Sequence, residues 1–140
     1  NFIKGLAMEK MGIPTFCTEQ DGDIPIPDFL WKILKRQGYI GRNIELGIRP
    51  EHFSEKFKKE NANLSADRCG LTGTIVVKEM LGAESIFYLK ERSALEFSAR
   101  LSVETQGRPG DELRLYVDMN RVHFFDTKTE KNIFYHGGQQ

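Results

Sequence analysis

Short stretches in which apolar and polar residues alternate run through most of this 140-residue chain. Alternation with a period of two is typical of strands that bury one face. It predicts strands in the ranges 43–48, 71–80, 85–90, 94–103 and 112–117. Residues 11–26 mix short apolar stretches with turn formers and predict further short antiparallel strands. The pattern therefore indicates a mostly β protein.

One segment has the pattern of a helix instead. Asp28 can cap its start, and Gly38 can end it. Its apolar residues fall on one helical face: Phe29, Leu30, Ile33 and Leu34. Trp31 lies near this face, and we expect it to pack against the core rather than to bind a ligand. The sequence thus predicts one short amphipathic helix.

Turn signals shape the second half of the chain. Gly82 interrupts the apolar alternation and predicts a hairpin or a bulged corner. Pro109 and Gly110 stand where a type II turn prefers proline and glycine. We expect 122–125 and 132–135 to form a closing hairpin around a long loop.

The spacing of these elements indicates the fold class. Short strands about ten residues apart, with one helix, fit one or two small OB-fold-like barrels better than a sandwich or an α/β sheet. We expect two intertwined β lobes, at about 1–53 and 70–140, joined by a polar connector at 54–69. A chain of this length can bury a core without disulfide bonds or metals.

Charge and cysteine content narrow the range of functions. Twenty basic and twenty acidic side chains cancel and are interspersed, so nucleic acid is an unfavoured partner. No apolar run approaches the roughly 20 residues that span a bilayer, and the N-terminus lacks the features of a secretory signal. Cys17 and Cys69 stand apart, which favours free thiols in a reducing compartment over a disulfide.

The sequence contains no motif for self-contained catalysis. A phosphate-binding loop is absent, and the three histidines, His52, His123 and His136, lack the spacing of a zinc site. The Asp21 and Asp23 pair is interpreted as a solvated turn. We therefore expect no catalytic, cofactor-binding or metal-binding residue in these 140 residues.

A polar cluster at a predicted turn could in principle hold an anion or a partner side chain. Its members are Asp118, Arg121, His123 and Asp126. Because Asp and Asn favour turns for local hydrogen-bonding reasons, a structural role is the preferred interpretation.

Three segments together resemble one known family. They are LGIRPEHF at 46–53, GTIVVKEMLGAE at 73–84, and a third that starts with PGDELRL at 109–115 and runs through HFFD at 123–126 to Ile133. Their order and spacing are similar to the C-terminal regulatory region, often called TOBE, of ATP-binding subunits from carbohydrate-import ABC transporters of the maltose and glycerol-phosphate type. The resemblance covers nearly the whole chain and implies an OB-like barrel unit.

The resemblance also implies partners and a location. The region would follow the ABC ATPase domain of the same chain, pair with a second copy of the subunit, and act with the membrane subunits of the transporter and a cytoplasmic regulator. It would lie in the cytoplasm at the inner face of the membrane. ATP and Mg²⁺ would belong to the parent subunit, because these residues hold no nucleotide-binding motif. The start at Asn1 rather than at a methionine suggests a piece of a longer protein.

Seven residues are the candidate interface or regulatory positions: Arg49, Glu51, His52, Gly82, Glu84, His123 and Asp126. We expect the first three to join lobes or subunits, and Gly82 with Glu84 to present a corner to a partner. Two plainer explanations stay open. Arg49 and Glu51 form an internal ion pair after the strand, or Gly82 serves only a turn that needs a positive φ.

Two further functions remain as alternatives. One is a module of the related molybdate-binding kind, which would bind a small oxyanion. The other is OB-type binding of single-stranded nucleic acid, with Tyr88, Phe97 and Tyr116 as stacking residues, which the balanced charge disfavours. The chain departs from the family pattern in its charged connector at 54–67, and at Glu130-Lys131, where that pattern has a glycine.

Overall fold

The structure is a computed structural model that describes residues 1–19, 22–56, 70–92 and 95–133. These residues form ten β-strands in antiparallel sheets and one α-helix. In chain order the described elements are β1 (Phe2–Lys10), β2 (Ile13–Thr18), β3 (Asp23–Pro25), α1 (Asp28–Arg36), β4 (Asn43–Gly47), the 3₁₀ helix η1 (Pro50–His52), β5 (Phe53–Ser54), β6 (Leu71–Leu81), β7 (Glu84–Lys90), β8 (Glu96–Ser102), β9 (Glu112–Val117) and β10 (His123–Asp126). The expectation of a mostly β protein with one short helix is confirmed.

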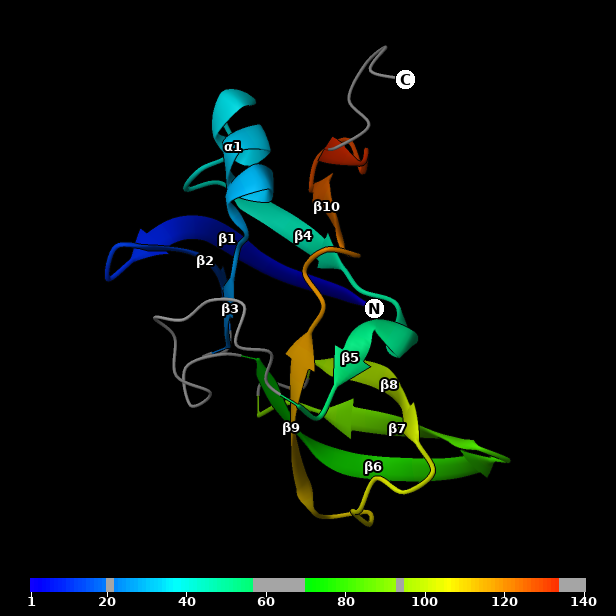
Figure 1. Cartoon of the computed structure of the whole chain (residues 1–140). Coiled ribbons are helices and arrows are strands. Elements are labelled where there is room, and N and C mark those ends of the chain that lie inside the picture. Colours follow the sequence, from blue (N-terminus) through cyan, green and yellow to red (C-terminus); the bar gives the residue numbers. More distant parts are fainter. Residues whose placement is uncertain (20–21, 57–69, 93–94, 134–140) are drawn as a thin grey trace.

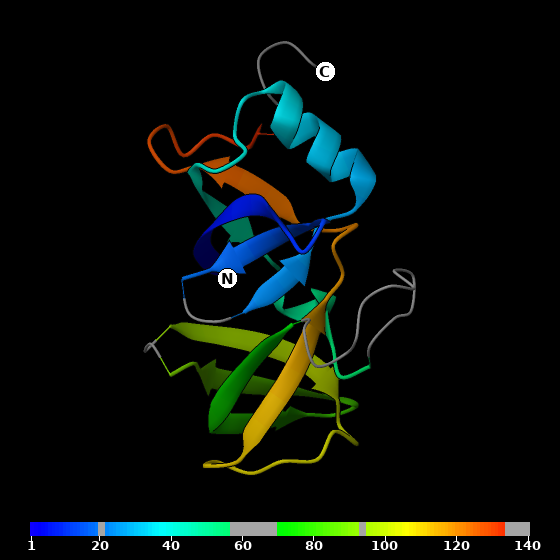
Figure 2. The same cartoon turned by 90° about the vertical axis from the view of Figure 1, so that its left-hand side faces the viewer.

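The strands form two antiparallel sheets (Figures 1 and 2). The upper sheet has the order β10-β4-β1-β2-β3, and the lower sheet has the order β5-β9-β6-β7-β8. In the lower sheet the two edge strands β5 and β8 contact each other, so this sheet is a nearly closed barrel. The OB-like fold expected from the sequence is therefore confirmed.

The chain passes between the sheets at two places. After β4 in the upper sheet it enters β5 in the lower sheet, and after β9 it returns to the upper sheet as β10 (Figure 1). Strand β10 pairs with β4, where Phe124 stands opposite Leu46. The predicted connector begins inside β5, and 57–69 lie outside the described residues. The division into lobes at 1–53 and 70–140 stays a prediction.

Helix α1 packs against the core beside the upper sheet (Figure 1). Leu30 and Leu34 are buried, and Trp31 packs against the core as expected. Phe29, which the sequence pattern placed on the buried face, is exposed. The predicted cap is also wrong: Pro27 precedes the first turn, and Asp28 lies inside the helix without a side-chain cap bond. Among the residues that the structure describes, no helix is both long and apolar enough to cross a membrane.

The predicted turns have the expected geometry. Leu81 and Glu84 pair across a two-residue loop in which Gly82 has a φ of 65°, the pattern of a type II′ hairpin. Gly110 has a φ of 97°, and the Asp111 N–H donates to the Arg108 carbonyl, which confirms the type II turn. The loop after β10 contains Glu130 at a φ of 62°, in agreement with a family preference for glycine there.

Strand β1 was not predicted. Its inward-facing residues are Ile3, Gly5 and Ala7, so two of the three are too small to give a visible apolar alternation. Gly5 cannot be enlarged, because a Cβ there would lie 2.3 Å from the carbonyl oxygen of Cys17. The loop between β1 and β2 is Met11-Gly12, with φ values of 56° and 80°. Both values are positive, as in a type I′ turn, but methionine is not a typical residue of that turn.

Replacing Met11 with asparagine should stabilise the protein. Asparagine tolerates the left-handed backbone better than methionine and is preferred before glycine in a type I′ loop. We expect Met11→Asn to raise the free energy of unfolding by about 0.5–1 kcal/mol in urea denaturation. Met8→Asn is the matched control, because it places the same residue inside β1, where asparagine is disfavoured. A lower urea midpoint for Met11→Asn would contradict the assignment.

Candidate functional site

Residues 48–53, called the junction below, carry the chain from the upper to the lower sheet. Pro50 begins η1, and the His52 N–H donates to the Arg49 carbonyl at 2.9 Å. The buried side chains of Ile48 and Phe53 hold the two ends. The Asp118 N–H donates to the His52 carbonyl at 2.9 Å. Because both ends are buried and the middle is hydrogen-bonded, the junction presents its outer side chains from a fixed backbone.

The side chain of Asn1 ties the junction to the edge of the barrel. Its Nδ2 donates to the carbonyl oxygens of Ile48 (3.0 Å) and Ser98 (2.8 Å), and its Oδ1 accepts the N–H of Ser98 at 2.8 Å. Ser98 lies on β8, the last strand of the lower sheet. The amide therefore takes the place that a further strand would occupy beside Ser98.

The three predicted junction residues differ in their surroundings. Arg49 and Glu51 are exposed, and no ion pair joins these two described residues, so the internal-pair explanation is wrong. His52 is half-buried, and its Nδ1 has no hydrogen-bond partner among the described residues. The two exposed charges are thus available to another molecule, whereas His52 belongs to the packed side of the junction.

Gly82 and Glu84 lie at the tip of the β6–β7 hairpin. Space around Gly82 is open, so its positive φ, rather than a close contact, accounts for the glycine. The turn thus has the positive φ that the plainer explanation requires, and the contact of this corner with a partner stays a prediction. Glu84 lies 3.8 Å from Arg100, and both side chains are about half exposed, so this ion pair adds little stability.

The polar cluster predicted around β10 is not a single site. Asp118 and Arg121 pair at 3.9 Å in the turn before the strand. His123 starts the strand, and its Nδ1 lies 2.8 Å from Nδ2 of Asn132. Asp126 ends the strand and belongs to the next turn. The sequence placed these residues together, but a strand spans about 3.3 Å per residue and separates the two groups.

Asp126 is the most strongly bound carboxylate among the predicted residues. It is 8% exposed. Its Oδ2 accepts the Tyr39 hydroxyl at 2.6 Å, and its Oδ1 accepts the N–H groups of Lys128 (2.8 Å) and Thr129 (3.0 Å). The Tyr39 bond, followed by these backbone bonds, lowers the pKa of Asp126 to about 2. The same bond raises the pKa of Tyr39. Asp126 therefore serves the fold, by fixing the loop after β10 to the segment after α1.

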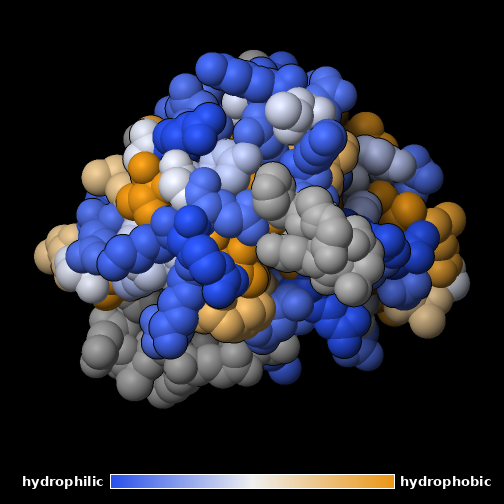
Figure 3. Space-filling model, turned by 90° about the horizontal axis from the view of Figure 1, so that it is seen from above, coloured by the Kyte–Doolittle hydropathy of each residue, from blue (hydrophilic) through white to orange (hydrophobic). Residues whose placement is uncertain are grey.

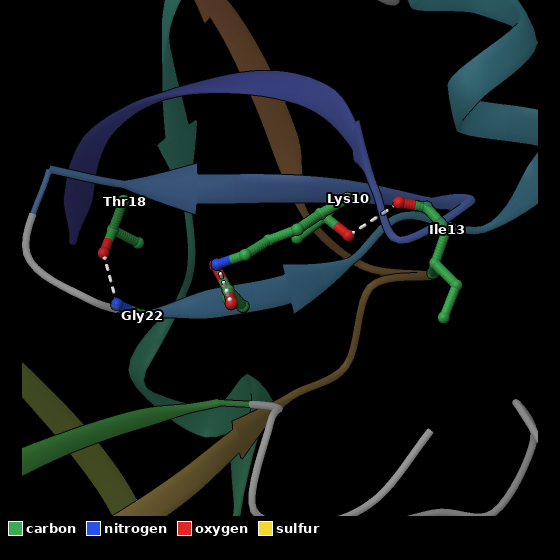
Figure 4. Close-up of polar contacts among 6 residues, drawn as sticks. Lys10, Ile13, Thr18 and Gly22 are labelled. Carbon is green, nitrogen blue, oxygen red and sulfur yellow. Dashed lines mark hydrogen bonds and ion pairs between the residues drawn. The ribbon is translucent and has the colours of Figure 1, made fainter. Parts of the chain in front are cut away.

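Among the residues that the structure describes, the other ionisable groups include an ion pair and a free thiol. The described residues contain no group of three or more His, Cys, Asp or Glu side chains that could hold a metal ion. Lys10 pairs with Asp23 at 2.6 Å, and the Thr18 hydroxyl accepts the Gly22 N–H in the neighbouring turn (Figure 4). Asp21, Cys69 and His136 lie outside the described residues. Cys17 is a free thiol, and burial, then Asp23, raises its pKa.

The three aromatic residues predicted for nucleic-acid stacking do not share a surface. Phe97 is 4% exposed and points into the barrel. Tyr88 is exposed and stands opposite Ser98, in the pair next to Leu89 and Phe97. Because adjacent pairs point to opposite faces of a sheet, Tyr88 and Phe97 lie on different faces. The prediction of a stacking platform is therefore wrong.

Seen from the α1 side, the surface is mostly hydrophilic, with hydrophobic areas that are small and separate (Figure 3).

Loss of the Tyr39 hydroxyl should lower the stability of the fold by an amount that depends on pH. A carboxylate with a lowered pKa contributes stability above its unfolded pKa of about 3.9, and this is lost as the pH falls through about 2. Tyr39→Phe should therefore lower the urea midpoint at pH 7 and merge with the parent protein below pH 2. Tyr88→Phe is the control, with no change expected at any pH. A Tyr39→Phe deficit that persists unchanged at the lowest pH would refute the carboxylate's role.

Loss of the Asn1 amide should loosen the contact between the sheets. Asn1→Ala removes bonds to two backbone segments, and we expect the free energy of unfolding to fall by about 1–2 kcal/mol. The exchange of the Ser98 amide hydrogen should also become faster. Asn43→Ala, at an exposed position in β4, is the matched control and should change stability by less than about 0.5 kcal/mol. Equal behaviour of the two variants would show that Asn1 does not hold the junction.

Comparison with known proteins gives relatives that match most of the chain. The chain is 33% identical over 114 residues to "Oligosaccharides import ATP-binding protein MsmX" of Bacillus subtilis, covering 79% of this chain and 29% of that protein. It is 31% identical over 123 residues to "Trehalose/maltose import ATP-binding protein MalK" of Thermococcus litoralis, covering 82% of this chain and 32% of that protein. The chain thus spans about a third of the length of these relatives.

A solved structure has a similar fold. The cytoplasmic molybdate-binding protein ModG, with molybdate bound, superposes with a TM-score of 0.65 at 16% identity, covering 89% of this chain and 94% of that one. This likeness concerns the fold alone. Two family models match in sequence order, the MalK OB fold domain at residues 1–53 and the TOBE domain at residues 46–125. Together with the sequence relatives, these matches show that the chain belongs to the TOBE family, with the MalK-type OB fold found in sugar-import ATP-binding proteins.

Proposed function

We propose that this chain is the C-terminal regulatory and pairing region of the ATP-binding subunit of a sugar-import ABC transporter. The observation that carries the proposal is the succession of MalK OB fold and TOBE matches over residues 1–125, among relatives named for oligosaccharide and trehalose/maltose import. The parent protein would then be about three times as long as this chain. Its ATPase domain would bind ATP and Mg²⁺, and these residues would not hydrolyse ATP.

In this proposal the junction supplies the contact between two copies. Arg49 and Glu51 project from a backbone that is fixed at both ends, and they do not pair with each other. Across a two-fold axis, Arg49 of one copy can meet Glu51 of the other twice, so one modest patch contributes two ion pairs. The membrane subunits and a cytoplasmic regulator remain as further partners, at the inner face of the membrane.

Charge exchange at the junction tests this pairing. In the native full-length gene product, Arg49→Glu alone should weaken dimerisation about tenfold in sedimentation experiments, since it places two like charges at each contact. The double variant Arg49→Glu/Glu51→Arg should restore it, because the opposite charges are then exchanged. Lys32→Glu, on the exposed side of α1, is the control. A native product no longer than this chain would contradict the transporter assignment, whereas failure of the double variant would contradict only the junction contact.

One feature favours a small-oxyanion module as the second candidate. A hollow of about 510 Å³ on the outer face of the lower sheet is lined by hydroxyl and cationic side chains: Thr72, Thr74, Lys90, Arg92 and Arg114. Such groups suit an oxyanion, although Glu91 and Glu112 also line the hollow and reduce its positive charge. Calorimetric titration of the chain with molybdate, phosphate and sulfate separates the two candidate functions. An oxyanion-binding module should release or absorb heat on binding one of these anions, whereas a pairing region has no need to bind them.

A further inference from the structure

The end of the β6–β7 hairpin is exposed on both faces. Met80 is 64% exposed and its neighbour Leu81 is 50% exposed, although successive residues of a strand point to opposite sides. Figure 1 shows the hairpin extending beyond the rest of the barrel. These apolar side chains therefore lie where the barrel does not cover them.

A bulge separates this projecting part from the barrel wall. The register of β6 against β7 shifts between Ile75 and Val77, so an extra residue, Val76, is inserted in β6. Val76 and Val77 are both exposed as a result. On the other side of β6, strand β9 pairs only as far as Thr74.

Beyond the bulge, β6 has a free edge. The hairpin closes on the pair Leu81 and Glu84, and the closing pair of a two-residue hairpin exchanges hydrogen bonds. Because every second pair along an antiparallel ladder does so, Glu79 and Ile86 also exchange hydrogen bonds. The alternation of an antiparallel ladder then turns the N–H and C=O groups of Met80 and Lys78, the residues on either side of Glu79, away from β7.

No other strand that the structure describes uses these outward groups. The backbone of Ile75 is the last to be paired, through the Asp111 carbonyl and the Gly110 N–H. No hydrogen bond within the described part of the chain involves the outward N–H or C=O of Lys78 or Met80. This edge can therefore accept an extended segment, which would gain backbone hydrogen bonds and contact exposed apolar side chains.

The charge beside the edge is negative overall. A hollow of about 920 Å³ adjoins Lys78, and its charged lining residues are Lys78, Glu104, Arg108, Asp111 and Glu112. Three carboxylates thus face two cations, and the Lys78 ammonium is already bound by the carbonyl oxygens of Thr105 (3.1 Å) and Gly107 (3.4 Å). Glu79 adds a further carboxylate on the other face of β6. A segment carrying positive charge fits this surface better than a neutral or acidic one.

A second copy of the same edge fits poorly. Antiparallel pairing about a two-fold axis must place outward-pointing residues opposite each other. The registers centred on Lys78 and on Glu79 put Lys78 opposite Lys78 or Glu79 opposite Glu79, and like charges directly opposite each other destabilise a sheet. The register centred on Met80 avoids like charges, but it places Lys78 opposite Gly82 in the turn, so only the two Met80 residues exchange hydrogen bonds. The edge therefore favours a different chain.

We propose that the outer edge of β6, at Lys78 and Met80, binds an extended, positively charged segment of another protein, which adds a strand to the lower sheet. This surface differs from the Arg49 and Glu51 contact and does not depend on the pairing of two copies. The apolar side chains of the added strand would meet Val77 and Leu81 on one face of the hairpin, or Met80 on the other.

A synthetic nine-residue peptide of alternating valine and lysine, capped at both ends, is the probe. It should protect the Lys78 and Met80 amide hydrogens from exchange and shift their NMR signals. A peptide of alternating valine and glutamate should bind about tenfold more weakly at low salt. The valine and lysine peptide with an N-methyl group on every amide should also bind about tenfold more weakly, because that peptide has no backbone N–H donor left on either edge.

Two variants of the chain locate the site. Met80→Pro removes an N–H that β7 does not use, so it should keep the fold and weaken peptide binding about tenfold. Met80→Val keeps the N–H and should bind normally. Should Met80→Pro fail to fold, the N-methylated peptide carries the same test on the parent chain.

Any of three results with the peptides would overturn the proposal. They are no binding of the valine and lysine peptide at about 1 mM, equal binding of its N-methylated form, and protection that maps to another strand. Protection of Lys78 and Met80 that rises with protein concentration in the absence of peptide would overturn it in favour of a second copy.

Discussion

The structure depends on how the edge of its barrel is closed. Strand β8 ends the lower sheet, and an unpaired strand edge is both costly to bury and prone to join another chain. At Ser98 the side chain of Asn1 supplies one acceptor and one donor, as a neighbouring backbone would. The same amide reaches the Ile48 carbonyl where the chain leaves the upper sheet. The Asn1 side chain thus satisfies backbone groups at the edge strand β8 and also fixes the junction, where the chain passes from one sheet to the other.

Local sequence signals predicted the parts of the fold that local physics determines. Gly82 and the Pro109-Gly110 turn were correctly placed, because positive φ values restrict which residues a turn can hold. Strand β1 was missed because Gly5 and Ala7 occupy its buried face, and because Met11 fills a turn position that asparagine usually marks. Pairing with β4, a non-local contact, therefore outweighs the weak local preference of that segment.

The candidate site was predicted only in part for the same reason. The exposed charges at Arg49 and Glu51 follow from a strand that stops at Pro50, which the sequence displays directly. By contrast, the polar residues around β10 were grouped by their closeness in sequence, whereas the strand separates them. The partner of Asp126 is Tyr39, which is 87 positions away, and no pattern in a single sequence indicates a contact of that kind.

The two surfaces proposed for partners use different means of selection. The junction offers opposite charges on a rigid backbone, an arrangement that suits a symmetric contact because each charge meets its complement twice. The β6 edge offers unpaired backbone groups, which by themselves would accept any strand, including that of another copy. Lys78 and Glu79 disfavour another copy of the same edge, because a symmetric register centred on either residue places like charges opposite each other. A projecting apolar hairpin can thus remain open to a partner strand without promoting the aggregation that such an edge would otherwise cause.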